Sequence, residues 1–361
     1  ALCSAAMLIF MDTVGEYGLS STITAVYSYP TLPYTIYSAI CTSPARFDMA
    51  GVLSLCLMLL IVLAMFIQYK ALGAKRFDFL DNGTQQAVPQ RLSRGRNVCL
   101  SAVVWIFVLI SIGIPAVSSL VMSFSSAISL TKFTFTLENY KNILSADSTL
   151  LVGIAHSLGL AVIAAVIGLV IAFCCAYVLT YAKTPLKKAI DMTTLVAMAV
   201  PGIVLGVGYI FVWNQKWLVP IGLHLYGTPA ILVLAVVAAA IPLINRILVA
   251  GMAKIPESLL IAAEMQGAGF FTKIKTILLP LLHNSSVSAV LSAFGGSIFN
   301  LAITTILYPP NWETLPVWIS DSYNDLKFGD AAAATIVSGV CIITIMALLE
   351  RLLNMRKARK G

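Results

Sequence analysis

Long apolar runs constrain the fold of this chain more than any other feature of its sequence. About 20 helical residues are needed to cross the hydrocarbon core of a bilayer. Runs of about that length or longer lie at 50–69, 98–123, 149–180, 189–213, 229–247, 284–306 and 331–350, with a shorter stretch at 1–19. Lipid offers no partner for backbone polar groups, so such runs must be helical. The sequence predicts an all-α polytopic membrane protein, with about seven full transmembrane helices plus a partial one at the N-terminus.

The basic residues predict which loops lie in the cytoplasm. If the 70–97 loop is inside and the helices alternate, 18 of the 23 Lys and Arg residues fall in inside loops and 5 in outside loops. Cytoplasmic loops carry such an excess of Lys and Arg. This orientation puts the C-terminus in the cytoplasm. It also accounts for the net charge of +8 without a nucleic-acid partner, and membrane lipid is the expected surrounding.

One predicted inside loop, 248–283, contains a polar segment between two apolar runs. Residues 256–280 carry Glu257, Glu264, Gln266, Lys273 and Lys275. A charged side chain at the bilayer centre costs about 2.5–3.5 kcal/mol, so this segment should lie outside the hydrocarbon. Pro256 favours a helix start, Gly267 to Gly269 favour a turn, and Pro280 should end the second segment. Two short helices are expected here.

The spacing of this segment carries a family resemblance. Ala262-Ala263, Gly267, Ile277 and Leu279-Pro280 are spaced as in the EAA loop of ABC-transporter permeases, and the chain resembles their MetI-like transmembrane domain. Leu137-Glu-Asn-Tyr140 and Ala199-Val-Pro-Gly202 look like two further elements of that family. The resemblance implies a permease subunit of a binding-protein-dependent importer in the bacterial cytoplasmic (inner) membrane.

The same resemblance implies the partners. They are a cytoplasmic ABC ATPase dimer, which would hold ATP and Mg, and an extracytoplasmic substrate-binding protein. The chain itself contains no GxxxxGK[ST] motif to cradle ATP, and no GxSxG, HExxH or metal-ligand cluster. We therefore expect no catalytic residue, metal or cofactor on this chain, which would be a transport subunit and not an enzyme.

The resemblance also assigns coupling residues to the loop. They are Glu257, Ala262, Ala263, Glu264, Gly267, Ile277, Leu279 and Pro280. The family usually has Glu before the Ala pair, where this chain has Ile261. On a helix, Glu257 and Glu264 lie about 40° and 60° from Ile261, so we hypothesise that one of them supplies the acidic contact with the ATPase. The alternative is an ordinary amphipathic loop at the membrane surface.

Two short matches indicate an internal repeat. Thr31-Leu-Pro33 recurs as Thr314-Leu-Pro316, and Asp48 before one apolar run recurs as Asp330 before another. The matches predict a parallel repeat, in which 1–69 forms the last two helices of a first permease unit. A basic cytoplasmic linker at 70–97 and a complete six-helix unit at 98–361 would follow. A first unit as long as the second implies an upstream part carrying a first docking loop, so we expect this sequence to be N-terminally truncated and to lack that loop.

Candidate pathway residues lie at two places. Asp12 and Glu16 are spaced i and i+4, and Glu16-Tyr17-Gly18 resembles an element of iron(III) permeases with two fused halves. Carboxylates in a pathway helix could meet a cationic substrate; the alternative is a helix-end role. Pro201 and Gly202 predict a bend, tolerable where protein or a cavity surrounds the backbone, or a packing kink without function.

The resemblance favours iron(III) as the substrate. Phosphonate, thiamine, polyamine and inorganic anions are alternatives. An ion-coupled secondary transporter is another class, and a non-transporting membrane scaffold is a third. A secondary transporter would need charges at the midplane, whereas the spans are almost empty of them and Asp191 and Arg246 lie near predicted inner ends.

Overall fold

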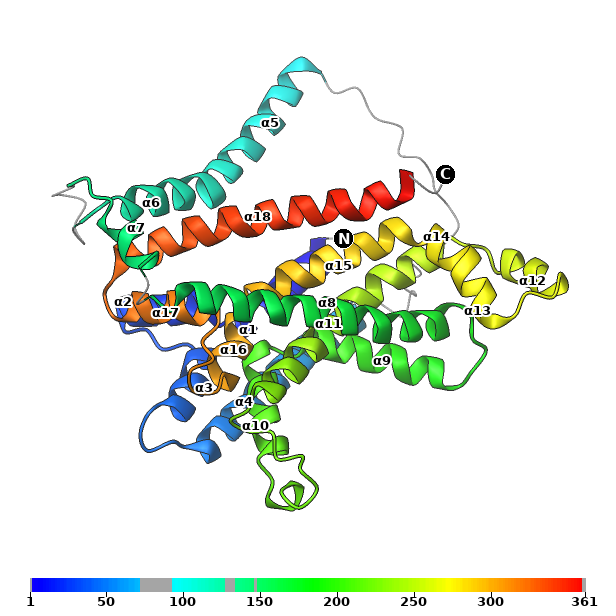
Figure 1. Cartoon of the computed structure of the whole chain (residues 1–361), viewed down its shortest axis with the longest axis horizontal. Helices are drawn as coiled ribbons and strands as arrows, with labels where there is room; N and C mark the ends of the chain where they lie inside the picture. Colours follow the sequence, from blue (N-terminus) through cyan, green and yellow to red (C-terminus); the bar gives the residue numbers. More distant parts are fainter. Residues whose placement is uncertain (1, 72–92, 127–133, 146–147, 359–361) are drawn as a thin grey trace. The chain divides into compact units, whose positions relative to one another are not determined.

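The computed structural model describes residues 2–71, 93–126, 134–145 and 148–358 (Figure 1). Helices dominate this part of the chain, where the β pairing is one isolated bridge between Ser125 and Phe135. The predicted all-α membrane fold is confirmed. Five helical segments are long and apolar enough to cross a membrane: α4 (Phe47–Ala71), α5–η1–α6 (Arg94–Ser123), α8 (Leu150–Tyr181), α11 (Pro229–Met252) and α18 (Phe328–Ala358).

Two bent pairs of helices would bring the number of spans to seven if each pair crosses the membrane once. The first joins α9 (Leu186–Ala199) to α10 (Gly202–Trp213) at 110°, and the second joins the Phe270–Leu281 segment to α15 (His283–Ile298) at 75°. The bend predicted at Pro201 and Gly202 is thus present in the first apolar run, 189–213, whereas the continuous helix expected over the second, 284–306, is wrong. The first breaks at Pro201, which has no N–H to donate. The second ends at Ile298, and a separate helix, α16 (Leu301–Leu307), begins after Asn300.

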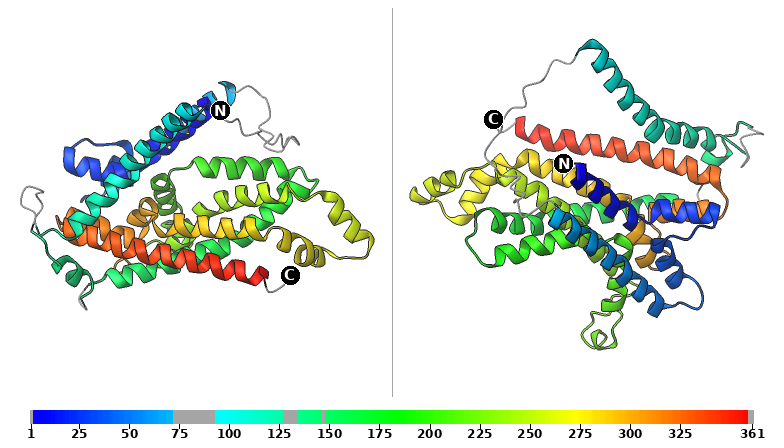
Figure 2. Two further views of the ribbon diagram at one scale, coloured as in Figure 1. Left: turned by 90° about the horizontal axis from the view of Figure 1, so that it is seen from above. Right: turned by 180° about the vertical axis from the view of Figure 1, so that it is seen from behind.

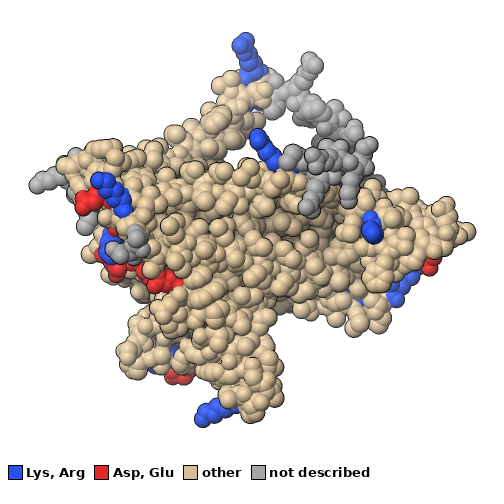
Figure 3. Space-filling view, in the orientation of Figure 1, with Lys and Arg blue, Asp and Glu red and all other residues tan. Residues whose placement is uncertain are grey.

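The remaining helices are short. They are α1 (Leu2–Gly15), α2 (Gly18–Tyr27), α3 (Leu32–Cys41), α7 (Glu138–Ile143), η3 (Lys216–Leu218), α12 (Glu257–Met265), α13 (Phe270–Lys273), η4 (Ile274–Leu278), α14 (Leu279–Leu281) and α17 (Leu315–Asn324). Within the long span, η1 (Leu109–Gly113) separates α5 (Arg94–Val108) from α6 (Ile114–Ser123). The view in Figure 3 is largely uncharged, with the visible Lys, Arg, Asp and Glu side chains towards its margins, as a membrane protein requires.

The chain forms two compact units, described here separately. Unit 1 comprises 1–75, 152–318 and 346–361. Its core lies where α11 packs against α15 and α9, and where α10 packs against α16 and α4. Ile231, Ile244 and Leu248 of α11 are completely buried. In the views of Figures 1 and 2, α12 and α13 project from one end of α8, α11 and α15.

Unit 2 comprises 76–151 and 319–345. In it, Asn139 and Tyr140 fix the end of α6. The Asn139 amide donates to the carbonyls of Ser123 and Ser125 at 2.9 and 3.0 Å, and the Tyr140 hydroxyl lies 2.8 Å from the Ser123 hydroxyl. These two residues belong to the Leu137–Tyr140 segment, which therefore joins α7 to the end of the preceding span.

The predicted repeat has a counterpart in the order of helices. The helices α3 and α17 are each 10 residues long, and each begins immediately after the Thr of a Thr-Leu-Pro triplet. The long helices that follow carry Asp48 and Asp330 in their first turns. The division into 1–69, 70–97 and 98–361 stays a prediction, and most of its linker lies outside the described residues.

Candidate coupling loop and helix breaks

The loop between α11 and α15 contains the predicted helices. α12 ends near Gly267, whose φ of +83° is the left-handed conformation that glycine adopts without strain. The Gly267 N–H donates to the Glu264 carbonyl and the Ala268 N–H to the Ala263 carbonyl, at 2.9 and 3.0 Å, as at a helix C-terminus closed by glycine. Pro280, expected to end the second segment, instead lies within α14, and the bend follows at Leu282.

An ion pair joins the two arms of this loop, which are α12 before the glycine turn and α13, η4 and α14 after it. Lys273 Nζ of α13 lies 2.9 Å from Glu264 Oε2 of α12, across the glycine turn. The Lys273 side chain is 14% exposed and that of Glu264 is 69% exposed. Glu264 thus has a partner within the loop. Glu257 is exposed in the first turn of α12, where a negative charge is favourable beside the positive helix end.

The loop exposes apolar side chains at its tip. Met265 is 86% exposed and Phe271 83% exposed, and Ile261 is also exposed. Of the other predicted coupling residues, Ala262, Leu279 and Pro280 are exposed, whereas Ala263 and Ile277 are half-buried. Exposed apolar side chains that are rimmed by charges are typical of a surface that binds another protein.

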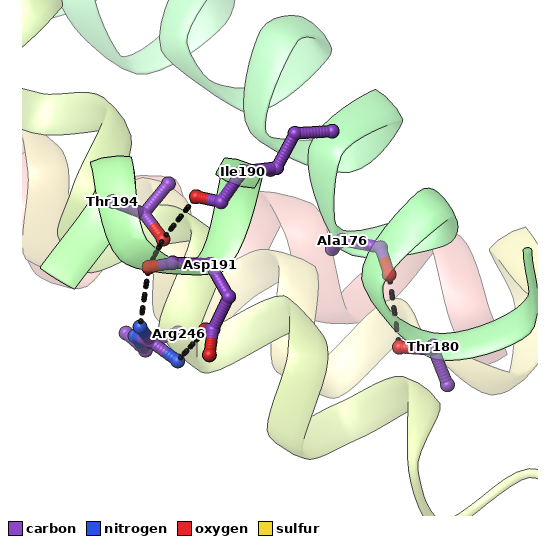
Figure 4. A network of polar contacts seen from close by, with 6 residues as sticks. All are labelled: Ala176, Thr180, Ile190, Asp191, Thr194 and Arg246. Carbon is purple, nitrogen blue, oxygen red and sulfur yellow. Dashed lines mark hydrogen bonds and ion pairs between the residues drawn. The ribbon is translucent and has the colours of Figure 1, made fainter. Parts of the chain in front are cut away.

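A second ion pair connects α9 with α11 (Figure 4). Arg246 Nη1 lies 2.9 Å from Asp191 Oδ1, and Arg246 Nη2 donates to the Asp191 carbonyl at 3.4 Å. The Thr194 hydroxyl donates to the same carbonyl at 2.9 Å. The two charges near the predicted inner helix ends therefore neutralise each other, which does not favour the ion-coupled class of transporter.

Two of the candidate pathway residues, Pro201 and Gly202, lie beside other helix breaks. A Cβ added at Gly15, the last residue of α1, would lie 2.9 Å from Pro201 Cγ. A Cβ at Gly202 would lie 3.0 Å from Ala302 Cβ in α16. The break between α1 and α2, the break at Pro201 and the start of α16 are therefore neighbours, although nearly the whole chain separates them in sequence.

Glu16 does not share a helix face with Asp12, as its i, i+4 spacing suggested, because α1 ends at Gly15. Its carboxylate accepts hydrogen bonds from the N–H groups of Gly18 and Leu19, at 2.9 and 2.7 Å. These bonds satisfy donors at the start of α2 that have no partner within the helix. This geometry matches the helix-end alternative. Asp12 is exposed on α1.

Sequence reasoning missed Asn300 and two tyrosines of α8. The Asn300 side chain accepts from the Ile303 N–H at 3.1 Å, so it caps α16. An Asn immediately before an apolar run is a cap signal that was available in the sequence. Tyr177 and Tyr181 touch the coupling loop, and no periodicity or motif indicates such contacts. In the part of the chain that the structure describes, no group of three or more His, Cys, Asp or Glu could hold a metal.

The family model described as "Binding-protein-dependent transport system inner membrane component" matches residues 164–359, more than half of the chain. The chain belongs to this family. The family describes inner-membrane components of binding-protein-dependent transport systems. The match includes the coupling loop, the α9–α10 break and the Asp191–Arg246 pair.

Individual relatives of this permease differ in their substrates. It is 22% identical over 361 residues to a ferric transport system permease protein, FbpB, of Actinobacillus pleuropneumoniae, covering 97% of this chain and 49% of the relative. This chain is also 30% identical over 168 residues to a putative 2-aminoethylphosphonate transport system permease protein, PhnV, of Salmonella paratyphi A. That alignment covers 46% of this chain and 61% of the relative. The chain thus spans about half of the first relative and less than two thirds of the second.

A solved structure supports the fold of this permease. It is that of a bacterial ABC transporter involved in the import of the acidic polysaccharide alginate. The TM-score is 0.58 at 15% identity, covering 73% of this chain and 96% of that one. At this identity the likeness extends to the fold alone. The recognition of a MetI-like permease, made from the loop spacing, is confirmed by the family model.

Proposed function

We propose that this chain forms the translocation pathway of an ATP-driven importer and couples to cytoplasmic ATPase subunits through residues 256–280. The single observation that carries the proposal is the α12–α13 loop. It projects from the helices, exposes Met265 and Phe271, and lies within the region matched by the family model. In the proposed orientation this loop and the C-terminus are cytoplasmic, and an extracytoplasmic binding protein delivers substrate to the opposite side. The ATPase subunits, and not this chain, would bind ATP and Mg.

The two candidate acids have different roles in this proposal. Glu264 is paired with Lys273 and keeps the two arms of the loop together. Glu257 is exposed at the start of α12 and makes the acidic contact that Ile261 cannot make. Ala262, Ala263 and Gly267 allow the ATPase to approach closely, because they carry little or no side chain. Ile277, Leu279 and Pro280 complete the second arm.

Iron(III) is the proposed substrate. The relative aligned over 97% of this chain is a ferric permease, and Asp12 lies exposed next to the Glu16 helix break. A 2-aminoethylphosphonate is the second candidate, because the PhnV relative has the higher identity over a shorter stretch. Uptake of radioactive iron(III), competed by unlabelled 2-aminoethylphosphonate, separates the two. Iron uptake that resists the competitor supports iron(III), and 2-aminoethylphosphonate uptake without iron uptake overturns it.

The coupling role is tested by removing both acids. In the complete transporter, Glu257→Gln with Glu264→Gln should leave the ATPase able to hydrolyse ATP but reduce substrate uptake per ATP by about tenfold, as expected for two lost charged contacts of roughly 1 kcal/mol or less each. The matched control is Glu138→Gln, which neutralises an exposed acid in the first turn of α7. Unchanged uptake per ATP in the double variant would refute the coupling role.

A further inference from the structure

The C-terminal end of α8 contacts the first residues of the coupling loop. The Tyr181 hydroxyl donates to the carbonyls of Met252 and Ile255, at 2.8 and 3.2 Å. Met252 is the last residue of α11, where carbonyl groups have no partner within the helix. A single hydroxyl therefore fixes the point at which α11 passes into the loop.

One turn earlier on the same helix, Tyr177 contacts α13, which follows the glycine turn. Its ring centroid is 5.4 Å from that of Phe270, with the planes at 88°, and 5.5 Å from that of Tyr181. Edge-to-face contacts at this separation are favourable. Phe270 begins α13, immediately after the glycine turn. Thus α8 touches the loop on both sides of its exposed tip.

The opposite end of α8 holds the segment between α16 and α17. The His156 ring stacks on that of Trp312, with centroids 4.0 Å apart and planes at 8°. Its Nδ1 lies 2.9 Å from the Glu313 carbonyl oxygen, so it donates to that oxygen. The Ser157 hydroxyl oxygen accepts from the buried Leu315 N–H at 2.8 Å. In the proposed orientation this 308–315 segment lies outside, on the side of the binding protein.

Between these ends α8 is a continuous helix. Its 32 residues span about 48 Å. It presents small buried residues to its neighbours, and a Cβ on Gly168 would lie 2.8 Å from Ile244 Cδ1 of α11. Small residues at such an interface let the two helix backbones approach closely, so α8 packs tightly against α11.

We propose that α8 transmits movement between the coupling loop and the 308–315 segment, with Tyr177 and Tyr181 as positioning residues at one end and His156 and Ser157 at the other. ATPase closure on the loop would shift α8 and so alter the surface that the binding protein meets. This rests on the proposed function, because it requires an ATPase bound at 256–280. A rigid element contacted at both ends is the physical basis for coupling over this distance.

Trp312 provides a native reporter for the test. Because it stacks on His156, a shift of α8 should change its fluorescence. The complete transporter is reconstituted in lipid, and the response to ATP with vanadate is measured. Trp312→Phe defines the Trp312 component among the five tryptophans. Tyr181→Phe, which removes one hydroxyl and keeps the ring, should reduce this component, because one lost hydrogen bond changes the equilibrium between the two positions of α8 about fivefold. Tyr209→Phe is the matched control, because its hydroxyl also bonds a carbonyl, that of Leu234.

The outcomes separate the two proposals. A transporter without a bound ATPase contradicts the proposed function. If the ATPase binds and hydrolyses ATP, an unchanged Trp312 response in Tyr181→Phe, or no response in the wild type, overturns the role of α8. Ser157→Ala tests the same role from the other end and leaves the coupling loop intact. It should keep ATP hydrolysis and lose the Trp312 response, and a full response in this variant would equally overturn the role of α8.

Discussion

Glu16 illustrates what the sequence predicts for one residue and what it leaves out. Its acidic character near a helix end was visible, and so was its place beside Tyr17 and Gly18. The interruption after Gly15 was not, because a single Gly beside Glu16 is also compatible with a continuing helix. Only the folded chain shows that both carboxylate oxygens accept backbone N–H groups. The ion pair of Glu264 with Lys273 is similar, since nine residues and a glycine turn separate the partners.

Removing the Glu16 carboxylate should destabilise the protein. Glu16→Ala leaves the first N–H groups of α2 without their acceptor, and losing such a cap costs about 1 kcal/mol. Asp12→Ala is the control, because this acid is exposed within α1 and lies away from the start of α2. Thermal unfolding of the purified transporter should show a lower melting temperature for Glu16→Ala alone. Equal melting of the two variants would contradict the capping role.

At the scale of helices, the apolar runs located the spans and Pro201 with Gly202 indicated one bend, but the break before α16 was not predicted. The run at 149–180 became α8, and the run at 229–247 became α11 although Pro242 lies inside that helix. The runs at 189–213 and 284–306 contain Pro201 and Asn300, which begin a new helix instead of continuing the old one. Such breaks depend on packing against other helices, as at Gly15 and Gly202. A single apolar run carries no record of those neighbours.

The packing of α11 against α15 can be tested at one glycine. A Cβ on Gly251 would lie 2.5 Å from Ser285 Oγ and 2.8 Å from Ser285 Cβ. Gly251→Ala should therefore lower stability by about 1–3 kcal/mol through overpacking. Gly208→Ala is the control, because a Cβ there meets nothing within 4 Å in α10 and Ala favours a helix. Melting curves of both variants test this, and a Gly251→Ala protein as stable as Gly208→Ala would contradict the packing.

For the whole molecule, charge predicted the topology, and contacts group the helix ends in the same way. Tyr181, Met252 and Phe270, all predicted inside, meet at one end of α8. His156, Trp312 and Leu315, all predicted outside, meet at the other. Contacts such as Tyr181 with Met252 join positions 71 residues apart. They could not be predicted from a single sequence, because no local pattern specifies which helices become neighbours.

The central claim is that ATP hydrolysis on partner subunits drives import through this chain. Its most direct test is substrate uptake by the complete transporter in liposomes, with the binding protein outside and nucleotide inside. The account predicts uptake that requires ATP inside the vesicles, persists when ion gradients are collapsed, and falls in the Glu257→Gln, Glu264→Gln variant. Uptake driven by an ion gradient without ATP would contradict it.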